Sequence, residues 1–558
     1  IKQRRNQRLS DAANHTTLDR VDVEITPPRK PGSIPLPFRL RPAQIAVDGF
    51  AYRYPGSRRP LLMGLTDVPV VREEAGTHAP RAAQTVRVPC EVGGQLTAGS
   101  ERDWYAVDVK RGEVLWIEAF GERIGSPVDL DVAVLDATGN TVLARFRDEV
   151  KNSGGKRFPS NHLDPSGRWV APADGRYLIV VRNLIGGLND DPRRVYRLSL
   201  RREVPDFRLV VVPRSDQPAS LNVPRGGRVI ADVLTFRRRG LTGSIRVSAK
   251  NLPTGISCPD VWLGPGVNRA PIVVTAERSA PPFVGVLHLE GTSRGVLRRV
   301  RGAGVVRAGL SNGSSRLTSA VPLAVSGTAP LRITADGHEP RMHHLYGKLN
   351  VRHSPGGVLD VAVDVEQSEA GHQAPVKLIG LGLPGGIPNQ TAMIAAGKKK
   401  GNISFYLPPT LPVGTYTIAV RAQTRVPNTN GKGTRNVTVF SNPVTFEVKP
   451  AAFVVQIDPY VPTRIRRGEI VQIKYTAKRI NGFIGKIHTE LAAPQKVIGL
   501  RGRGVTFVGQ TESGTIQIIA NEDAPLGRQP FLRLFAVGVV EDQPAFHGGC
   551  FLNLEIVK

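Results

Sequence analysis

A repeated spacing of glycines is the feature that most constrains the fold of this chain. Two sets of glycines share internal spacings of 17 and 42 residues and lie 242 residues apart: Gly226, Gly243 and Gly285, and Gly468, Gly485 and Gly527. The surrounding residues also agree, since Arg239–Ile245 resembles Asn481–Ile487. Self-similarity at a fixed period predicts an array of like modules.

A middle copy is expected between these two, because 242 residues is twice about 121, the size of one sandwich module. The segment Leu383-Pro384-Gly385-Gly386-Ile387 corresponds to Leu252-Pro253-Thr254-Gly255-Ile256. Each copy alternates short strands with turn glycines, a pattern typical of an immunoglobulin-like sandwich, here without a Cys-Trp-Cys core. We therefore predict three such domains, at 204–328, 329–449 and 450–558.

A different strand-rich unit precedes the repeats. In the stretch Gly99–Ala119, every second residue from Tyr105 to Val109 is apolar, and a second alternating strand follows a turn at 110–113. This pattern predicts a β-hairpin with one buried face, and Trp116 is available to close the core. With 59 Gly and 45 Pro in 558 residues, helices are expected to be scarce.

Further strands are predicted at 128–135, 175–181 and 195–200. Apolar and polar residues alternate over Asp129–Asp136, which predicts a half-buried antiparallel strand. The segment 171–181 combines a turn with a strand that is apolar on both faces, as in the core of a sandwich.

Several motifs follow one another in residues 70–203, over about the length of one domain: Glu73-Glu74, His78-Ala79-Pro80 to Gln84, Asp103-Trp104-Tyr105, Pro172 to Tyr177 and Val195 to Leu198. In their order and spacing, these motifs resemble the pre-peptidase C-terminal domain family. Ala75-Gly76-Thr77 stands where the family usually has a Glu-Pro-Asn form, which leaves the boundary of the first strand open. The resemblance implies a jelly-roll-like β-sandwich without catalytic residues, used in targeting or substrate binding on secreted or surface proteins.

The three repeats resemble the bacterial immunoglobulin-like modules that follow such domains in large planctomycete-type surface or periplasmic proteins. The predicted fold class is therefore all-β: tandem β-sandwiches, one jelly-roll-like and three immunoglobulin-like. Residues 1–69 are basic and rich in proline, notably over 25–42, and are expected to form an extended arm or a partly ordered linker.

The formal net charge of +28 suggests an anionic partner, although an Arg-rich solvated surface explains it equally well. Basic clusters fall mostly in predicted turns and are the predicted contacts to such a partner: Arg237, Arg238, Arg239, Arg298, Arg299, Arg301, Lys398, Lys399, Lys400, Arg464, Arg466 and Arg467. Guanidinium groups suit acidic proteins or acidic polysaccharides, since they bind carboxylates in a bidentate way. No nucleic-acid motif is present.

Two short matches to catalytic or cofactor-binding motifs lack the secondary structure that these motifs require. Gly291-Thr292-Ser293-Arg294-Gly295 matches a nucleophile elbow but precedes a strand pattern rather than a helix, and the G-x-G-x-x-G match at 380–385 lies inside a repeat. We predict no enzyme activity, no cofactor and no metal.

Two metal hypotheses remain open as alternatives. Calcium is conceivable at Asp129, Asp131 and Asp136, although outward carboxylates on a strand are more often solvated. Metal binding or a pH-sensitive contact is conceivable at His338, His343, His344 and His353, although a surface segment between domains explains that cluster better.

The predicted function is that of a non-catalytic extracytoplasmic scaffold or adhesion protein, a structural component of a cell surface, filament or large complex. The alternatives are the accessory region of a larger secreted hydrolase or peptidase, and a polysaccharide-binding module. Three scattered cysteines do not define the redox compartment, and no apolar run is long enough to span a membrane. The chain begins at Ile1 and is expected to be a processed or partial product.

Overall fold

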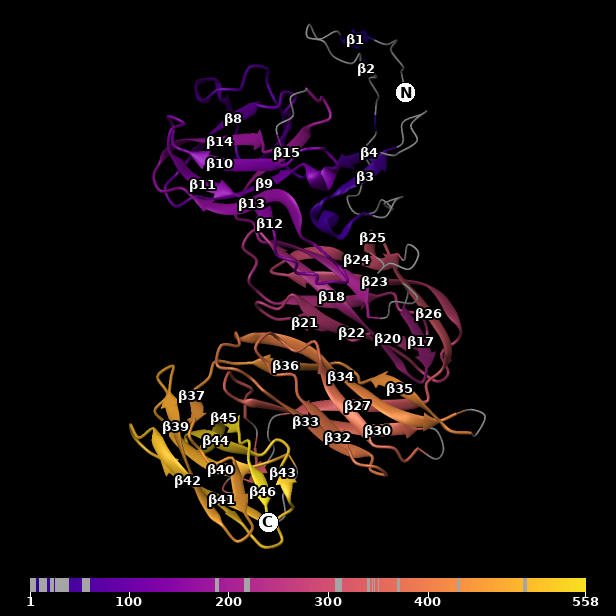
Figure 1. The fold of residues 1–558 in the computed structure, drawn as a ribbon, viewed down its shortest axis with the longest axis vertical. Coiled ribbons are helices and arrows are strands. Elements are labelled where there is room, and N and C mark those ends of the chain that lie inside the picture. Colours follow the sequence, from indigo (N-terminus) through magenta and orange to yellow (C-terminus); the bar gives the residue numbers. More distant parts are fainter. Residues whose placement is uncertain are drawn as a thin grey trace. The chain divides into compact units, whose positions relative to one another are not determined.

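The computed structural model is built of β-strands. It describes residues 40–52, 61–185, 190–214, 221–306, 314–338, 351–368, 372–428, 432–494 and 499–558, with short pieces at 7–9, 18–20, 25, 342–343, 345 and 347–349. Within these ranges the only helical elements are the 3-10 turns η1 (Pro42–Ala46), η2 (Pro80–Ala82) and η3 (Glu122–Ile124). The predicted all-β class is confirmed (Figure 1).

The chain divides into two compact units. The first contains 1–208 with the segments 236–241 and 301–319, and the second contains 209–235, 242–300 and 320–558. Strands β16 (Asp206–Pro213), β18 (Arg228–Arg238) and β24 (Val296–Val306) contribute residues to both. The predicted module at 204–328 is therefore shared between the two units.

The first unit contains a β-sandwich. One sheet has the order β11-β10-β14-β8-β6: β11 (Val142–Phe146), β10 (Leu130–Leu135), β14 (Gly175–Asn183), β8 (Arg102–Val109) and β6 (Gln84–Thr85). The other has the order β12-β13-β9-β15-β7-β5: β12 (Asp148–Glu149), β13 (His162–Val170), β9 (Val114–Phe120), β15 (Val195–Arg202), β7 (Cys90–Gln95) and β5 (Val70–Arg72). Apolar side chains from both sheets form one core.

The predicted hairpin at 99–119 is wrong in its pairing. Strand β8 hydrogen-bonds to β14 and β9 to β13 and β15, so the turn at 110–113 crosses from one sheet to the other. The connection between β13 and β14, which also passes from one sheet to the other, holds this turn in place. Gly112 N donates to Ala171 O at 2.8 Å, and Arg111 N donates to Asp174 Oδ1 at 2.6 Å. The predicted inward faces of both strands are nevertheless buried in the core.

Two burial predictions in this sandwich also need correction. Trp116 does not close the core, because it lies on the opposite face of β9, opposite Arg168 and Arg201 in register; Trp169 occupies the core instead. Strand β10 is buried at every position rather than on one face, because a second apolar cluster around Trp104 covers its outer side. The prediction of a strand apolar on both faces holds for β14.

Residues 40–52 and 61–64, predicted as part of the extended arm, are folded. Turn η1 precedes a pair of antiparallel strands, β3 (Gly49–Tyr52) and β4 (Leu61–Gly64). Leu40, Ile45 and Val47 are at most 4 % exposed. The free energy gained by burying these side chains offsets the conformational entropy that the segment loses when it is ordered. Most of the remaining arm, with its proline-rich stretch, lies outside the described residues, apart from the short pair β1 (Gln7–Leu9) and β2 (Leu18–Arg20).

The sequence repeats are visible in the backbone of the second unit. Ile256 N donates to Pro253 O at 3.1 Å, and Ile387 N donates to Pro384 O at 3.2 Å, so the two Leu-Pro-x-Gly segments form the same turn. Their glycines, Gly255 and Gly386, have φ of +72° and +85°, which a side chain rarely adopts.

Within 209–328, the described strands of the second unit form one large sheet that also includes β16, β18 and β24. Its other strands are β17 (Leu221–Arg225), β19 (Ile245–Lys250), β20 (Ile256–Ser257), β21 (Val261–Leu263), β22 (Arg269–Ala276), β23 (Phe283–Ser293) and β26 (Val321–Thr328), whereas β25 (Ser314–Thr318) belongs to the first unit.

The next repeat is a sandwich with its own core. Its strands are β27 (Leu331–His338), β30 (Val358–Ser368), β33 (Lys400–Tyr406), β31 (Val376–Leu381), β32 (Thr391–Ile394), β34 (Gly414–Pro427), β35 (Thr434–Phe440) and β36 (Val444–Val448). Tyr416 OH donates to Pro412 O at 2.5 Å, four residues upstream, which is the tyrosine corner common in immunoglobulin-like sandwiches. Between β27 and β30, the short strands β28 (Met342–His343) and β29 (Gly347–Lys348) pair with each other.

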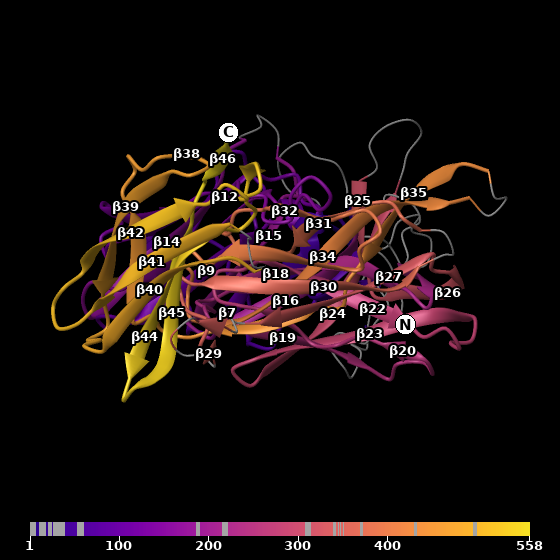
Figure 2. The ribbon, with the colours of Figure 1, turned by 90° about the horizontal axis from the view of Figure 1, so that it is seen from below.

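The last repeat packs a seven-stranded sheet against three short strands around another core. The sheet has the order β37 (Phe453–Ile457), β39 (Ile470–Arg479), β42 (Ser513–Ala520), β41 (Leu500–Phe507), β40 (Lys486–Ala492), β44 (Arg533–Val540) and β45 (Gln543–Phe551). Figure 2 shows the long strands β39, β42, β41 and β40 side by side. The short strands are β38 (Arg464–Arg466), β46 (Glu555–Val557) and β43 (Gly527–Arg528). Across the described residues, no helix has the length and apolar character needed to cross a bilayer.

Candidate functional site

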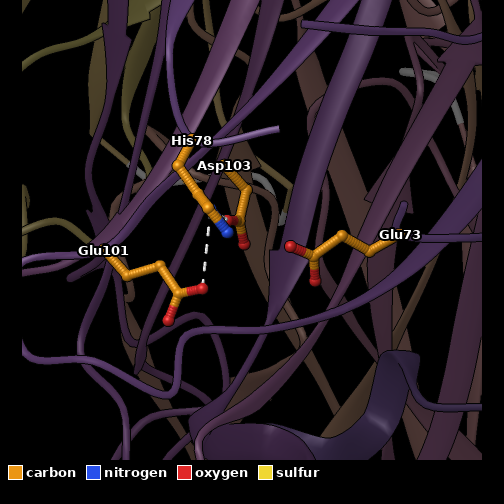
Figure 3. A group of neighbouring side chains, drawn as sticks. All are labelled: Glu73, His78, Glu101 and Asp103. Atoms are coloured by element: carbon orange, nitrogen blue, oxygen red, sulfur yellow. Dashed lines mark hydrogen bonds and ion pairs between the residues drawn. The ribbon is translucent and has the colours of Figure 1, made fainter. Parts of the chain in front are cut away.

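Three carboxylates and one imidazole converge at one end of the first sandwich. The possible ligand atoms of Glu73, His78, Glu101 and Asp103 all lie within 4.8 Å of one another. Figure 3 shows their side chains pointing toward a common space. Among the described residues this is the one such group of His, Cys, Asp and Glu side chains.

Local backbone structure brings these residues together. Glu73 directly follows β5, and its N–H donates to Gly93 O at 3.0 Å. Glu101 directly precedes β8, and Asp103 is the second residue of that strand. The connecting loop is held against β8 because Trp104 N donates to Thr77 O at 2.9 Å. His78 is thereby placed beside Asp103, 25 residues away in the sequence.

The four side chains differ in exposure and in their contacts. Asp103 is fully buried; its Oδ1 lies 3.1 Å from His78 Nδ1, and its Oδ2 accepts a hydrogen bond from Tyr196 OH at 2.7 Å. His78 is about half exposed and lies 3.5 Å from Glu101 Oε1. Backbone N–H groups hold the two glutamates: Gln95 N donates to Glu73 Oε2 and Ala98 N to Glu101 Oε2, each at 2.7 Å.

Burial and mutual repulsion perturb these carboxyl groups. Burial, followed by the negative charge of Glu73, raises the pKa of Asp103 to about 8. Burial likewise raises the pKa of Glu73. The phenols of Tyr105 and Tyr196, 2.5 Å apart, extend the network into the core, and burial raises the pKa of both.

This arrangement can bind a proton or a divalent cation, because either one reduces the repulsion between the clustered carboxylates, of which Asp103 is buried. The donors are carboxylate oxygens and one imidazole nitrogen. Oxygen ligands suit calcium, magnesium and manganese, whereas an imidazole suits zinc and other transition metals. Manganese and zinc therefore match the mixed set best.

The two hypothesised metal sites lie elsewhere: the structure does not assemble the calcium site, and it describes the histidine site only in part. Asp131 pairs with Arg182 at 2.7 Å, and Asp136 Oδ1 accepts hydrogen bonds from its own turn, so Asp129, Asp131 and Asp136 do not converge on one point. His353 is buried and packs near His547, with ring centroids 6.2 Å apart. The side chains of His343 and His344 lie outside the described residues, and His338 is half-buried.

The predicted anionic-partner contacts separate into two groups. Arg238, Arg239 and Arg301 are largely buried in ion pairs with Glu118, Asp206 and Asp48 respectively, so the prediction that they face a partner is wrong for these three. Three further members are half-buried: Arg237, Arg298 and Arg467, whose Nε donates to Ala524 O at 2.8 Å. The second group is exposed and consists of Arg299, Lys398, Lys399, Lys400, Arg464 and Arg466.

The buried ion pairs lower carboxyl pKa values. Although burial opposes it, Arg238 and Arg123 lower the pKa of Glu118 to about 2. Sequence reasoning missed these pairs and the carboxylate cluster, because their members are far apart in the chain. The one signal for the cluster is the pair of carboxylates two residues apart, Glu101 and Asp103, at the start of a strand.

Comparisons with known proteins add little. No family model matches the chain, and no curated protein matches it. A Porphyromonas gingivalis protein of unknown function has 13% identity and a TM-score of 0.15, over 41% of this chain and 100% of its own. A marsupial T cell receptor has 8% identity and a TM-score of 0.14, over 62% and 99%. Escherichia coli alpha-2-macroglobulin has 12% identity and a TM-score of 0.13, over 91% and 31%.

Proposed function

We propose that this chain is a non-catalytic, extracytoplasmic scaffold or adhesion protein that works as a stiff spacer in a surface, filament or large complex. The observation that carries the proposal is a buried ion pair between two successive sandwiches of the second unit. Arg533 Nη1 and Nη2 donate to Asp360 Oδ1 and Oδ2 at 2.8 and 2.7 Å, and both side chains are at most 4 % exposed.

Other contacts of this joint are also buried. Val358 N donates to His547 Nε2 at 3.1 Å, and Gly549 N donates to Gly356 O at 2.9 Å. An apolar cluster contains Leu349 and Val351 from one side and three residues of β44 from the other. Domains joined by small polar interfaces move relative to one another by default, so a joint of this kind supports a fixed spacing.

The exposed basic residues supply a means of attachment. Lys398 and Lys399 directly precede β33, Lys400 is its first residue, and all three are exposed. They suit contact with acidic protein surfaces or acidic polysaccharide. The polysaccharide-binding alternative rests on the same residues, and the accessory region of a larger secreted hydrolase is the remaining alternative.

The carboxylate cluster has a supporting role in this proposal. A cation bound by His78 together with the three carboxylates of the cluster would tie the loop carrying His78 to strand β8. The cluster would then stabilise the first sandwich, as a structural metal site does.

The test combines fractionation with loss of the gene in the source organism. We expect the protein in an extracytoplasmic fraction, and we expect its loss to change the composition of a surface assembly. Charge reversal of all three lysines, K398E, K399E and K400E, should release the protein from that assembly, whereas R176E, a matched change at an exposed arginine, should not. A cytoplasmic location, or hydrolase activity in the purified chain, would refute the proposal.

A further inference from the structure

A small cavity with two arginines in its wall lies within the second unit. Its volume is about 200 Å³, and its walls come from three places: the end of β17 with the start of β18, the segment leading into β27 with the first residues of that strand, and strand β35. Arg228 comes from the first of these and Arg332 from the second. The described lining residues include no carboxylate.

The two guanidinium groups are incompletely neutralised. Arg332 Nε lies 2.9 Å from Glu366 Oε2, whose side chain is 39% exposed. Arg228 Nη1 donates to the carbonyl of Ile333 at 2.6 Å, but its buried Nε has no hydrogen-bond partner. Two positive charges therefore share one partly exposed carboxylate.

The energetic cost of this arrangement appears in the pKa of Arg228. Burial, followed by the positive charge of Arg332, lowers that pKa to about 10. A buried donor without a partner adds a desolvation penalty. An anion placed between the two groups would reduce both costs.

The size and lining of the cavity limit what it can hold. Drug-sized ligands occupy pockets of roughly 300 to 1,000 Å³, so this cavity is too small for them. Its volume equals that of about seven water molecules. Apart from the two arginines, Thr438 is the one described lining residue with a polar side chain, and the others, such as Pro330 and Phe440, are apolar or glycine.

We propose that this cavity binds a small oxyanion, such as sulfate, phosphate or a carboxylate, between the guanidinium groups of Arg228 and Arg332. Planar guanidinium groups bind such anions through paired hydrogen bonds. The anion is free in solution or is the acidic group of a sugar. Because the walls come from two successive repeats, binding would also strengthen the contact between them, beyond the scaffold role proposed above.

The test is calorimetric titration of the full chain at low ionic strength with sulfate, phosphate and acetate, with chloride as the control anion. We expect saturable binding with one site, at least about tenfold weaker in R228Q and R332Q, since loss of one charge-assisted pair costs more than about 1.4 kcal/mol. R176Q, which removes an exposed arginine of the first unit, should bind like the unaltered chain. Equal binding by R228Q and the unaltered chain, or no saturable binding, overturns the proposal.

A second variant keeps the test decisive if R228Q does not fold. Thr438 is an exposed position of β35 that lines the cavity, so T438E would place a carboxylate there. We expect T438E to raise the unfolding midpoint of the second unit and to abolish anion binding; unchanged anion binding would contradict the proposal. Glucuronate tested beside acetate distinguishes the two sources: tighter binding of glucuronate indicates an acidic sugar, and equal binding indicates a free anion.

Discussion

The ion pair between Arg533 and Asp360 allows the sharpest test of the proposed joint. In R533M the Asp360 carboxylate stays buried, with Ser404 Oγ as its remaining side-chain donor at 2.6 Å. Removing one member of a buried pair costs about 3 to 5 kcal/mol, because the other charge is left without compensation. In the unaltered chain Arg533 and Ser404 lower the pKa of Asp360 although burial opposes them, so the variant should shift this pKa upward.

Hydrogen exchange followed by mass spectrometry is the appropriate assay. The four tryptophans lie outside the two joined sandwiches, at positions 104, 116, 169 and 262, so their fluorescence would not report on this joint. Exchange resolves β30 and β44 separately within the full chain. A loss of about 3 kcal/mol corresponds to roughly a hundredfold faster exchange through local opening, since each 1.4 kcal/mol is a factor of ten.

Two comparisons complete the design. The matched control is K486M, which removes an exposed lysine paired with Asp542 at 3.2 Å and should change exchange only slightly. The double variant D360L/R533M replaces both charges with apolar groups and should recover most of the loss. The reasoning is refuted if R533M exchanges like K486M, or if the double variant is as unstable as R533M.

Three further predictions follow from other parts of the chain. After treatment with a chelator, added manganese or zinc should raise the unfolding midpoint of the first sandwich. D103N should abolish this effect, whereas D108N, at an exposed position of the same strand, should retain it. An equal effect in D103N would exclude the cluster as the cation site. Burial lowers the pKa of His547 to about 4, below its value of about 6.5 in the unfolded chain. The stability that the neutral imidazole contributes is therefore complete above pH 6.5 and should fall by about 3 kcal/mol as the pH drops to 4. Calorimetry should show a smaller loss of stability over this range in H547Q, and an identical loss would contradict the role of His547. Removing the corner hydrogen bond with Y416F should cost about 1 kcal/mol in urea unfolding of the second unit, and no measurable change would show that this bond is not stabilising.

The repeats were predictable because turn chemistry is local. Gly255 and Gly386 occupy positive φ in equivalent turns, and the matched pairs Arg239-Gly240 and Asn481-Gly482 also have positive φ. A residue that must adopt such a conformation is constrained by its own backbone and not by distant partners.

The candidate sites were not predictable in the same way. Asp360 and Arg533 are 173 positions apart, and the cavity between Arg228 and Arg332 needs a wall from β35. Composition placed many arginines on the chain, but only the folded structure separates those in buried ion pairs, such as Arg238, from exposed residues such as Lys399.

The stretch Gly99–Ala119 separates what the local sequence determines from what only the tertiary structure decides. Alternation along the chain determined that Tyr105, Val107 and Ile117 face a core, because successive side chains of a strand point to opposite faces. Tertiary structure alone decided that β8 and β9 belong to different sheets, that Trp116 lies outside the core, and that Asp103 joins Glu73 and His78. The physical reason is that a strand's faces depend on its own residues, whereas its partners depend on hydrogen bonds to strands far away in the sequence.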